Sequence, residues 1–454
     1  MSSMWNDPIS RRRLLSRALA GAAVLTPVRM LASPALAGAM SSARPLAATE
    51  FDATVATAWF DLVGRLIRGT PGYSPPVASR ALGCLGVGLY EAVVPGMPDH
   101  VSLAGTLHAL PPMPAIGHNA AYHWPSVANA TMGAMARSLF PTAPEALQAE
   151  IDALEAQLAA DVPRGILLRS FDRGRQVAAA VDSWARSDGG HEGYLRNFPA
   201  GYVPPAGPGL WVPTPPAFQP ALQPTWGTNR SMAIEQTLAC DPAPPPAFSS
   251  DSGSPFHAEA LEVYQTVNGL TTEQREIALF WSDDPGRTST PPGHSISIVG
   301  PILRLQDRSL ADAAVAYART GIAVCDAFIA CWRVKYRYNL LRPITYIRSH
   351  IDTGWGDPLP LVTPPFPEYT SGHSVQSAAA AEVLTATFGT VAFTDHTHDA
   401  RGLAPRSFGS FTAFAQEAAI SRLYGGIHYR SAIERGLEQG RCIGTAVASI
   451  PLRR

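Results

Sequence analysis

The chain has 454 residues, of which 46% are hydrophobic, and a formal net charge of −1 at pH 7. This length is sufficient for one large hydrophobic core or for two smaller ones. The near-zero net charge argues against a nucleic-acid-binding protein, which usually carries a basic surplus. Only 16% of the residues are charged, below the usual value of about a quarter, and this indicates closely packed helices.

The first 37 residues have the composition of an export signal. Three arginines at positions 11–13 precede an uncharged stretch at 18–28, and small residues at 35–37 suit a cleavage site. Paired arginines before a modest apolar run resemble a twin-arginine signal, so we expect a periplasmic or secreted protein. A basic disordered tail is the alternative. No other segment has the roughly 18 uninterrupted apolar residues of a membrane span, so we do not expect an integral membrane protein.

Helical periodicity dominates the rest of the chain, whereas period-2 alternation and hairpin signals are nearly absent. We therefore predict an all-α fold built from helical bundles. We also predict an N-terminal helical layer with a proline-rich wrap over residues 50–250, and a catalytic bundle over 251–454. The predicted helices cover residues 51–67, 78–94, 117–138, 144–160, 168–187, 256–268, 272–282, 312–341, 372–388, 409–423 and 431–448.

A proline-rich segment separates the two predicted parts and runs from Gly189 to Ser250. A segment of this length in a compact protein is usually a lid, a wrap over the core, or disordered. Its aromatic residues favour an ordered wrap, because they can anchor it: Tyr202, Trp211, Phe218 and Trp226.

The five cysteines include no CxxC pair and predict neither a disulfide framework nor a zinc site. Cys325 and Cys331 lie in one predicted helix, where we expect them to be packing residues. A single disulfide is compatible with the sequence, but its pairing cannot be read from the spacing.

Two cations seven residues apart, Lys335 and Arg342, form the first of three motifs. On one helix they would lie within about 20° of each other and roughly 10 Å apart along the axis. Both side chains could then reach one anion. Pro343 disfavours helix at the preceding residue, so we expect the helix to end at Arg342. A solvated basic helix face is the structural alternative.

The second motif, Ser371-Gly372-His373, follows a proline-rich approach and opens an alanine-rich helix. Ser371 is a natural N-cap. Gly372 lets backbone N–H groups approach a ligand closely, and a helix N-terminus favours an anion. His373 would project from the first turn as an acid–base group. An ordinary capped helix with an incidental histidine is the alternative.

Arg422 and His428 form the third motif. Six residues on a continuous helix correspond to about 240° of rotation, so the two side chains would point in different directions. Gly425 and Gly426 lie between them and can break the helix, which would let both face one pocket. By itself such a pair is usually structural.

In this order, the three motifs are far more specific than any one of them. The pattern Lys-x6-Arg-Pro, Ser-Gly-His and Ser-Arg-x5-His, over residues 330–435, resembles the superfamily of vanadium-dependent haloperoxidases and type 2 phosphatidic acid phosphatases. The Pro-Pro-Phe-Pro-x-Tyr segment before Ser371 and the Trp332-x2-Lys-Tyr-x-Tyr-Asn segment are similar to the haloperoxidase branch. Trp281 and Pro291-Pro-Gly-His294 extend the similarity to its secreted bacterial members.

The resemblance implies a pocket for vanadate, for which phosphate would compete. His428 would bind the vanadium through a ring nitrogen, and His373 would contact the apical oxygen and act as general acid–base. Lys335 would also polarise the peroxide, and Phe366 is a candidate for the halide site, with a weak preference for chloride. The residues that would hold the anion, by charge or by hydrogen bonds, are Lys335, Arg342, Ser371, Gly372, His373, Arg422 and His428.

The implied reaction is the oxidation of a halide by hydrogen peroxide on vanadate bound to His428. The alternative is an acid phosphatase that cleaves a phosphomonoester, with His428 as nucleophile and His373 protonating the leaving alcohol. Ala432 stands where the phosphatase pattern has an aspartate that orients the second histidine. Glu434 or a backbone carbonyl could replace it, and a degenerate oxyanion-binding member is a third alternative. A homo-oligomer is compatible with the sequence.

Three further polar groups lie outside these motifs. The segment 395–399, Asp-His-Thr-His-Asp, is dense in potential metal ligands, but such loop clusters are usually solvated turns. Asp283 and Asp284 could bind a cation, although a turn at a helix end is the better interpretation. His294 suits either the mouth of the pocket or a structural role.

Overall fold

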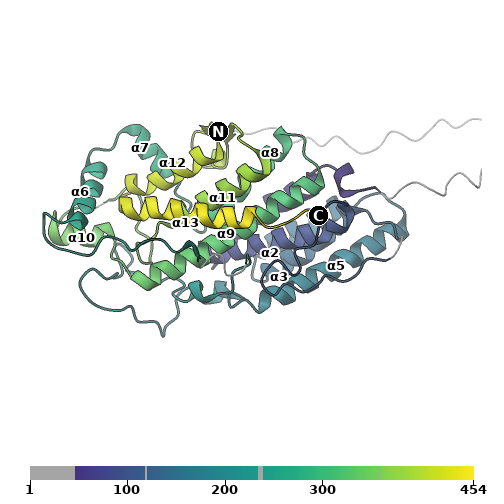
Figure 1. Cartoon of the computed structure of the whole chain (residues 1–454), viewed down its shortest axis with the longest axis horizontal. Helices are drawn as coiled ribbons and strands as arrows, with labels where there is room; N and C mark the ends of the chain where they lie inside the picture. The colour runs from purple at the N-terminus through teal and green to yellow at the C-terminus, as the bar shows by residue number, and fades with distance from the viewer. Residues whose placement is uncertain (1–45, 118–119, 234–238, 357) are drawn as a thin grey trace, which may run out of the picture. The chain divides into compact units, whose positions relative to one another are not determined.

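The computed structural model describes residues 46–117, 120–233, 239–356 and 358–454. The export signal predicted over residues 1–37 lies outside the described residues. Helices make up nearly all of the regular structure, which confirms the all-α prediction (Figure 1). The helices are α1 (Thr54–Gly69), α2 (Pro75–Val93), α3 (Trp124–Leu139), α4 (Glu145–Gln157), α5 (Arg164–Arg186), α6 (Pro255–Asn268), α7 (Thr272–Phe280), α8 (Thr290–Leu305), α9 (Leu310–Tyr338), α10 (Pro343–His350), α11 (Gly372–Phe388), α12 (Phe411–Tyr424) and α13 (Arg430–Ala448).

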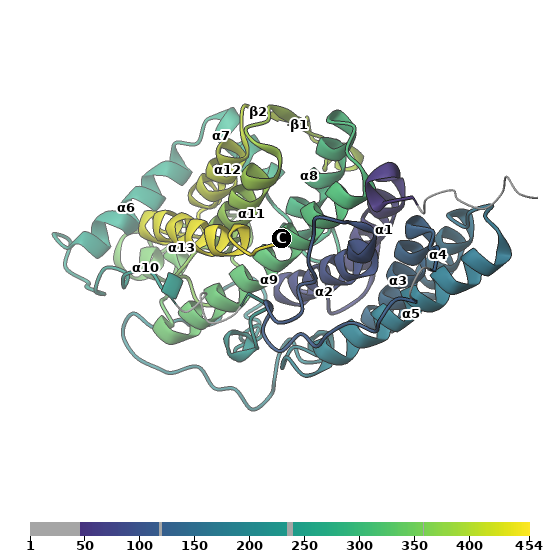
Figure 2. The same ribbon diagram turned by 45° about the vertical axis from the view of Figure 1, so that its right-hand side comes forward.

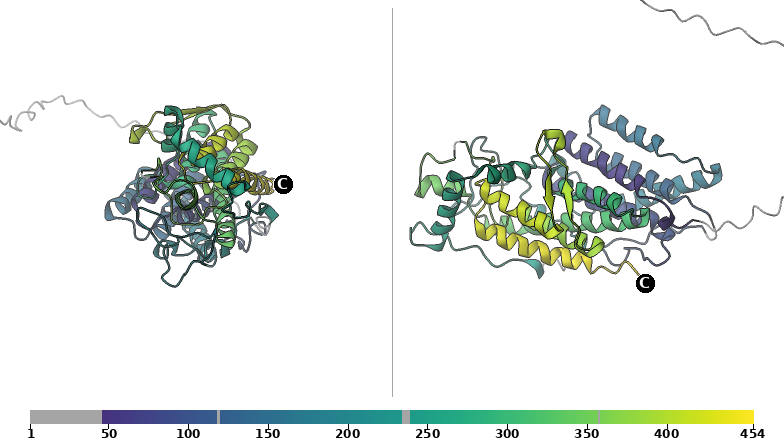
Figure 3. Two further views of the ribbon diagram at one scale, coloured as in Figure 1. Left: turned by 90° about the vertical axis from the view of Figure 1, so that its left-hand side faces the viewer. Right: turned by 90° about the horizontal axis from the view of Figure 1, so that it is seen from above.

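Two long apolar helices, α2 and α9, pack against each other at the centre of the fold. A Cβ atom at Gly86 would lie 2.6 Å from the carbonyl oxygen of Tyr317, and one at Gly321 would lie 2.6 Å from that of Leu82. The two backbones can therefore approach closely only because both positions are glycine. On the outer side of α2, away from α11 and α13, α3, α4 and α5 form a further layer (Figures 2 and 3).

The same two central helices are long and apolar enough to cross a membrane. The relevant windows of Pro75–Gly96 and Leu310–Tyr338 are 100% and 89% buried inside the protein. Packing in the core accounts for their hydropathy, so they are weak evidence for a membrane span.

A second close helix pair, α11 and α13, carries the predicted site at one end. Gly436, Gly440 and Gly444 lie along α13 where it meets α11, and a Cβ at Gly440 would overlap with the carbonyl oxygen of Val375. These glycines bring the start of α11 against the turn that precedes α13, so residues around 371 and 428 become neighbours.

Several predicted boundaries are wrong. The helix predicted over 117–138 begins at Trp124, with Pro125 in its first turn. The helix predicted over 312–341 ends at Tyr338, because Asn339 adopts a left-handed conformation (φ 45°). Arg342 then lies in extended backbone as the N-cap residue of α10. The expectation that Lys335 and Arg342 share one helix face is therefore wrong.

Two helices and a pair of short strands were not predicted. Helix α8 starts with consecutive prolines, which the first turn of a helix tolerates because its N–H groups have no helical partner. Helix α10 likewise starts at Pro343. Strands β1 (Phe393–Asp395) and β2 (Arg406–Phe408) form an antiparallel pair, and three residues per strand are too few to show a period-2 pattern.

The proline-rich segment is ordered over its described residues. Trp211 and Trp226 are buried as predicted, whereas Phe218 is 61% exposed and does not anchor the segment. The backbone N–H of Trp211 donates to the carbonyl of Asn339, and that of Leu222 donates to the carbonyl of Pro365. The segment therefore lies along the same loops that carry the first two motifs.

A disulfide between Cys240 and Cys442 ties this segment to α13. It is the single bridge that the sequence allowed but could not assign. Cys325 and Cys331 are free and buried, in agreement with their expected role in packing.

The α11–α13 contact predicts that Gly440→Ala lowers the free energy of unfolding by about 1–3 kcal/mol, because the added methyl group has no space against the α11 backbone. Chemical denaturation followed by circular dichroism measures the change. Gly165→Ala in α5 is the matched control, since a Cβ there meets no atom within 4 Å. Equal stability of the two variants would contradict the proposed role of this contact.

Candidate functional site

The three motifs converge on one pocket. A cavity of about 120 Å³ is lined by Gly372 and His373 at the start of α11, by Arg422 in the last turn of α12, and by His428 and Phe366. The remaining predicted site residues, Lys335, Arg342 and Ser371, are fully buried beside it.

The turn between α12 and α13 places Arg422 and His428 on the same pocket. Helix α12 ends at Tyr424, and Gly426 takes a positive φ of 75°. This confirms the predicted helix break at the glycine pair. The Arg422 guanidinium donates from Nη2 to the carbonyl of Trp281 (2.8 Å) and from Nε to the hydroxyl of Ser421 (3.1 Å).

Arg342 reaches the pocket from its own N-cap position. It donates from Nε to the carbonyl of Phe366 and from Nη1 to that of Ile427, both at 2.8 Å, and Nη1 lies 3.3 Å from Nε2 of His428. Its Nη2 is buried and has no hydrogen-bond partner among the described residues. Burial lowers the pKa of Arg342 to about 10, so the side chain stays charged at neutral pH.

The ammonium group of Lys335 donates three hydrogen bonds to backbone carbonyls. Nζ donates to Pro367, Glu368 and Thr370 at 3.0, 3.0 and 2.6 Å. Burial lowers its pKa to about 8. In this arrangement Lys335 contributes positive charge to the pocket rather than a direct hydrogen bond.

The Phe366 ring lies between two of these cations. Its centroid is 5.0 Å from Nζ of Lys335 and 4.8 Å from Cζ of Arg342. Both distances suit cation–π attraction, which is strong where water is excluded. The ring therefore covers the charged side chains and closes the pocket with an apolar wall.

The carboxylate that orients His428 is Glu368, which the sequence analysis missed. Its Oε1 accepts from Nδ1 of His428 at 2.7 Å and from the backbone N–H of Tyr429 at 2.9 Å. Glu434, the predicted substitute, is instead largely exposed and lies 3.9 Å from Arg430. The signal was present in the sequence, because Glu368 is the carboxylate within the Pro-Pro-Phe-Pro-x-Tyr motif.

These contacts define the state of the His428 ring. With Nδ1–H donating to Glu368, the Nε2 lone pair faces Arg342 and the pocket. Burial, with the positive charges of Arg342 and Lys335, holds the pKa of His428 well below its ordinary value. Burial raises the pKa of Glu368, and the charges of Arg342 and Lys335 oppose this effect. The 2.7 Å contact between Nδ1 and Oε1 requires a proton between these two atoms.

His373 and Ser371 sit at the start of α11. Ser371 is the N-cap residue as predicted, and its hydroxyl accepts from the N–H of Ser374. Nε2 of His373 lies 3.0 Å from the carbonyl of Trp281 and must donate to it. Its Nδ1 then carries the lone pair. Burial and the charge of Arg422 hold the pKa of His373 well below its ordinary value, so the ring is neutral at pH 7.

The charge balance of this site suits an oxyanion. Lys335, Arg342 and Arg422 are buried at 0, 0 and 4% exposure. Glu368 lies near the first two, and Asp283 and Asp284 line the cavity near Arg422. None of the described carboxylates forms a direct ion pair with these three cations, so an anion that joins them is favourable. The unpartnered Nη2 of Arg342 offers such an anion a donor. The residues therefore fit vanadate or phosphate.

The polar residues that the sequence indicated outside the three motifs divide into an exposed set and a buried set. Asp284, His396 and Asp399 are exposed, as expected of turns. Asp283, Asp395 and His398 are 4, 3 and 2% exposed, and His294 is 1% exposed. The prediction of a solvated turn is therefore wrong for Asp395 and His398, because the hairpin loop folds against the start of α8. Asp283 follows the end of α7 as predicted, but its side chain is buried, and His294 is buried in the core rather than exposed at a pocket mouth.

Known proteins share this architecture. The family model of the second helical-bundle domain of vanadium chloroperoxidase matches residues 315–452. The vanadium chloroperoxidase of Curvularia inaequalis is 25% identical over 173 residues, which are 33% of this chain and 27% of that protein. The matched part thus spans about a quarter of that relative's length.

Solved structures extend the similarity to nearly the whole chain. A bacterial vanadium-dependent iodoperoxidase is 36% identical, with a TM-score of 0.80 over 90% of this chain and 98% of its own. A bacterial vanadium-dependent chloroperoxidase has the same fold, with a TM-score of 0.66 at 16% identity over 85% of this chain and 93% of its own. The chain therefore belongs to the vanadium-dependent haloperoxidase family.

Proposed function

We propose that this protein is a vanadate-dependent haloperoxidase that oxidises a halide with hydrogen peroxide, with His428 as the residue that binds vanadium. The observation that carries the proposal is the environment of His428. Its Nε2 lone pair opens toward buried cations, while its Nδ1 is held by Glu368 at 2.7 Å. A hydrogen-bonded carboxylate on the second nitrogen fixes the tautomer and raises the basicity of a metal-binding histidine.

Bound vanadate supplies a Lewis acid that keeps its oxidation state while it activates peroxide toward a halide. The protein contributes positive charge that is fixed in place before the reaction. Arg342 and Arg422 would neutralise the oxyanion, and the buried Lys335 would add positive charge to the pocket without a direct hydrogen bond to the anion. Ser371 and the N–H of Gly372 would donate hydrogen bonds from the start of α11, where the helix dipole also favours an anion. Preorganised donors of this kind cost no reorganisation during reaction.

His373 is placed to move a proton. Nδ1 is its proton-accepting atom, because Nε2 donates to the carbonyl of Trp281 at 3.0 Å. The neutral ring could take a proton from incoming hydrogen peroxide and later return it to the leaving oxygen. An anion bound beside it would raise its pKa from the low value set by burial and Arg422.

We also propose that the protein works outside the cytoplasm after twin-arginine export. The arginines at 11–13 and the apolar run that follows them motivate this proposal. The Cys240–Cys442 disulfide supports it, because such bonds persist in oxidising compartments. Blocking the twin-arginine pathway should retain the protein, detected by fractionation, in the cytoplasm.

A paired assay tests the function. Vanadate-loaded protein should oxidise iodide and bromide with hydrogen peroxide, and excess phosphate should suppress this activity by competing for the pocket. His428→Ala should lower the rate by at least about 100-fold, whereas the exposed His396→Ala should not change it.

Hydrolysis of an aryl phosphate that vanadate inhibits would instead indicate the phosphatase. Neither turnover would indicate a non-catalytic oxyanion-binding protein.

Glu368→Gln should weaken vanadate binding or halide oxidation by about 10–100-fold, because an amide cannot stabilise the same His428 tautomer as a carboxylate. Equilibrium dialysis with vanadate and initial rates provide the two measurements. Glu434→Gln is the matched control and should stay within about twofold of wild type. Equal losses in both variants would show that Glu368 has no special role.

Vanadate affinity should also depend on the protonation of Lys335. Its pKa is lowered to about 8, and an anion binds best to the protonated form, so affinity should fall as the pH rises through 8. The ratio of the dissociation constants of Lys335→Met and wild type isolates this effect, because the ionisation of vanadate itself cancels. The ratio should be largest near pH 6.5 and approach one above pH 9. A constant ratio would mean that Lys335 does not titrate here.

A further inference from the structure

A second group of buried titratable side chains lies beside Trp281, next to the oxyanion pocket, whose wall includes Asp283. It consists of Asp283, His294, Asp395 and His398, each no more than 4% exposed. They come from three segments, namely the turn after α7, the first turns of α8, and the end of β1 with the loop that follows it. Burial of four such groups requires strong partners.

The hydrogen bonds within this group leave two atoms without partners. His294 lies 2.9 Å from Oδ2 of Asp283 through Nδ1 and 2.7 Å from Oδ2 of Asp395 through Nε2. Oδ1 of Asp283 and Nε2 of His398 form an ion-pair contact at 3.2 Å, and neither atom has a partner of good hydrogen-bond geometry among the described residues. Buried polar atoms without partners are rare and unfavourable.

This spacing is the one that a metal ion would impose. Bonds from zinc to imidazole nitrogen and carboxylate oxygen are about 2.0–2.1 Å, which places neighbouring ligands of a tetrahedral ion about 3.3 Å apart. The potential ligand atoms of Asp283, His294 and His398 all lie within 4.8 Å of one another. A small shift of the His294 ring would complete the set.

The charge of the group also favours a divalent cation. The carboxylates of Asp283 and Asp395 both contact the single imidazole of His294, at 2.9 and 2.7 Å. A divalent ion would balance the charge of both buried carboxylates, and it binds histidine in its neutral form.

We propose that Asp283, His294 and His398 form a site for a divalent transition-metal ion of the zinc type, next to the oxyanion pocket and sharing Asp283 with its wall. Two imidazole nitrogens and one carboxylate suit zinc, whereas calcium and magnesium prefer oxygen ligands only. Asp395 would keep its hydrogen bond with the other nitrogen of His294, a common arrangement for metal-bound histidines.

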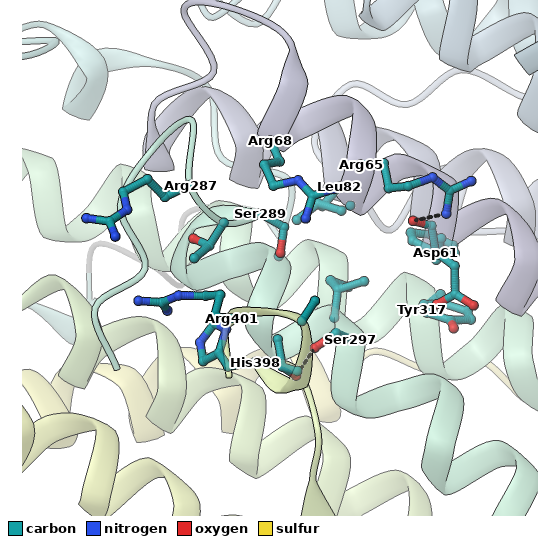
Figure 4. Close-up of a pocket in the computed structure, with 17 residues that line it drawn as sticks. Asp61, Arg65, Arg68, Leu82, Arg287, Ser289, Ser297, Tyr317, His398 and Arg401 are labelled. Atoms are coloured by element: carbon teal, nitrogen blue, oxygen red, sulfur yellow. Dashed lines mark hydrogen bonds between the residues drawn. The ribbon is translucent and has the colours of Figure 1, made fainter. Parts of the chain in front are cut away.

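The surroundings of His398 indicate how the ion would enter. His398 lines a neighbouring pocket together with Arg68, Arg287 and Arg401 (Figure 4). Such a cationic wall repels a free metal ion. We therefore expect the ion to be taken up during folding and to exchange slowly afterwards.

The ion would support the oxyanion pocket through Trp281. The Trp281 ring stacks on His294 with centroids 4.6 Å apart, and the carbonyl of Trp281 accepts from both His373 and Arg422. Holding Asp283 and His294 together would fix this residue in place. The proposed role is thus structural, and its test does not need the activity.

Metal analysis of the full chain tests the site. The protein should be expressed without a histidine tag in zinc-supplemented medium and dialysed against chelator-free buffer. Wild type and the exposed control His396→Ala should each hold about one zinc per chain, and His398→Gln and Asp283→Asn should each hold less than about 0.2. Less than about 0.1 zinc in wild type, or equal contents in all four proteins, would overturn the proposal.

Thermal unfolding keeps the test decisive if the two ligand variants do not fold. Removing the zinc from wild type and from His396→Ala with a strong chelator should lower the unfolding temperature by roughly 3–6 °C, because the ion binds the folded chain only. Readdition of zinc during refolding should restore it. An unchanged unfolding temperature after the zinc has left would also overturn the proposal.

Discussion

The site depends on burying three cations without pairing them directly with carboxylates among the described residues. Carboxylates would satisfy Lys335, Arg342 and Arg422 but would also cancel the charge that an oxyanion needs. The protein uses backbone carbonyls instead, and those around Lys335 come from Pro367, Glu368 and Thr370. Carbonyl dipoles satisfy hydrogen bonds while leaving the formal charge intact. The irregular segment before α11 is therefore a requirement of the site, since a regular helix would use these carbonyls internally.

Helix packing brings that segment to the second histidine. The glycines of α13 let α11 approach, and the N–H of Ser371 donates to the carbonyl of Ala432. Glu368 in the same segment then reaches Nδ1 of His428 at 2.7 Å. The carboxylate that orients His428 thus comes from the segment before α11. In the phosphatase pattern, the corresponding carboxylate follows the histidine in the sequence. The alanine at position 432 does not weaken this site. Only its backbone carbonyl takes part, as the acceptor for the N–H of Ser371.

Local chemistry in the sequence was sufficient to predict the helical class, the N-cap at Ser371 and the helix break at Gly425–Gly426. The shared helix face of Lys335 and Arg342 was wrong, because Asn339 in a left-handed conformation ends α9 and no strong breaker marks that position. The Glu368–His428 contact and the Asp395–His294 contact join segments that are 60 and 101 residues apart. No periodicity or spacing rule reports such contacts, so motif analysis identified the residues but not their partners.

Two different parts of the chain hold the side chains of the oxyanion pocket in place. On one side, Lys335 and Arg342 are held by the chain segment 366–370, which the disulfide-linked proline-rich segment covers. On the other side, His373 and Arg422 both donate to the carbonyl of Trp281. The ring of the same residue, Trp281, stacks on His294. A disturbance of the buried group around His294 should therefore alter the acid–base residue and one arginine, while the environment of His428 and Glu368 stays the same.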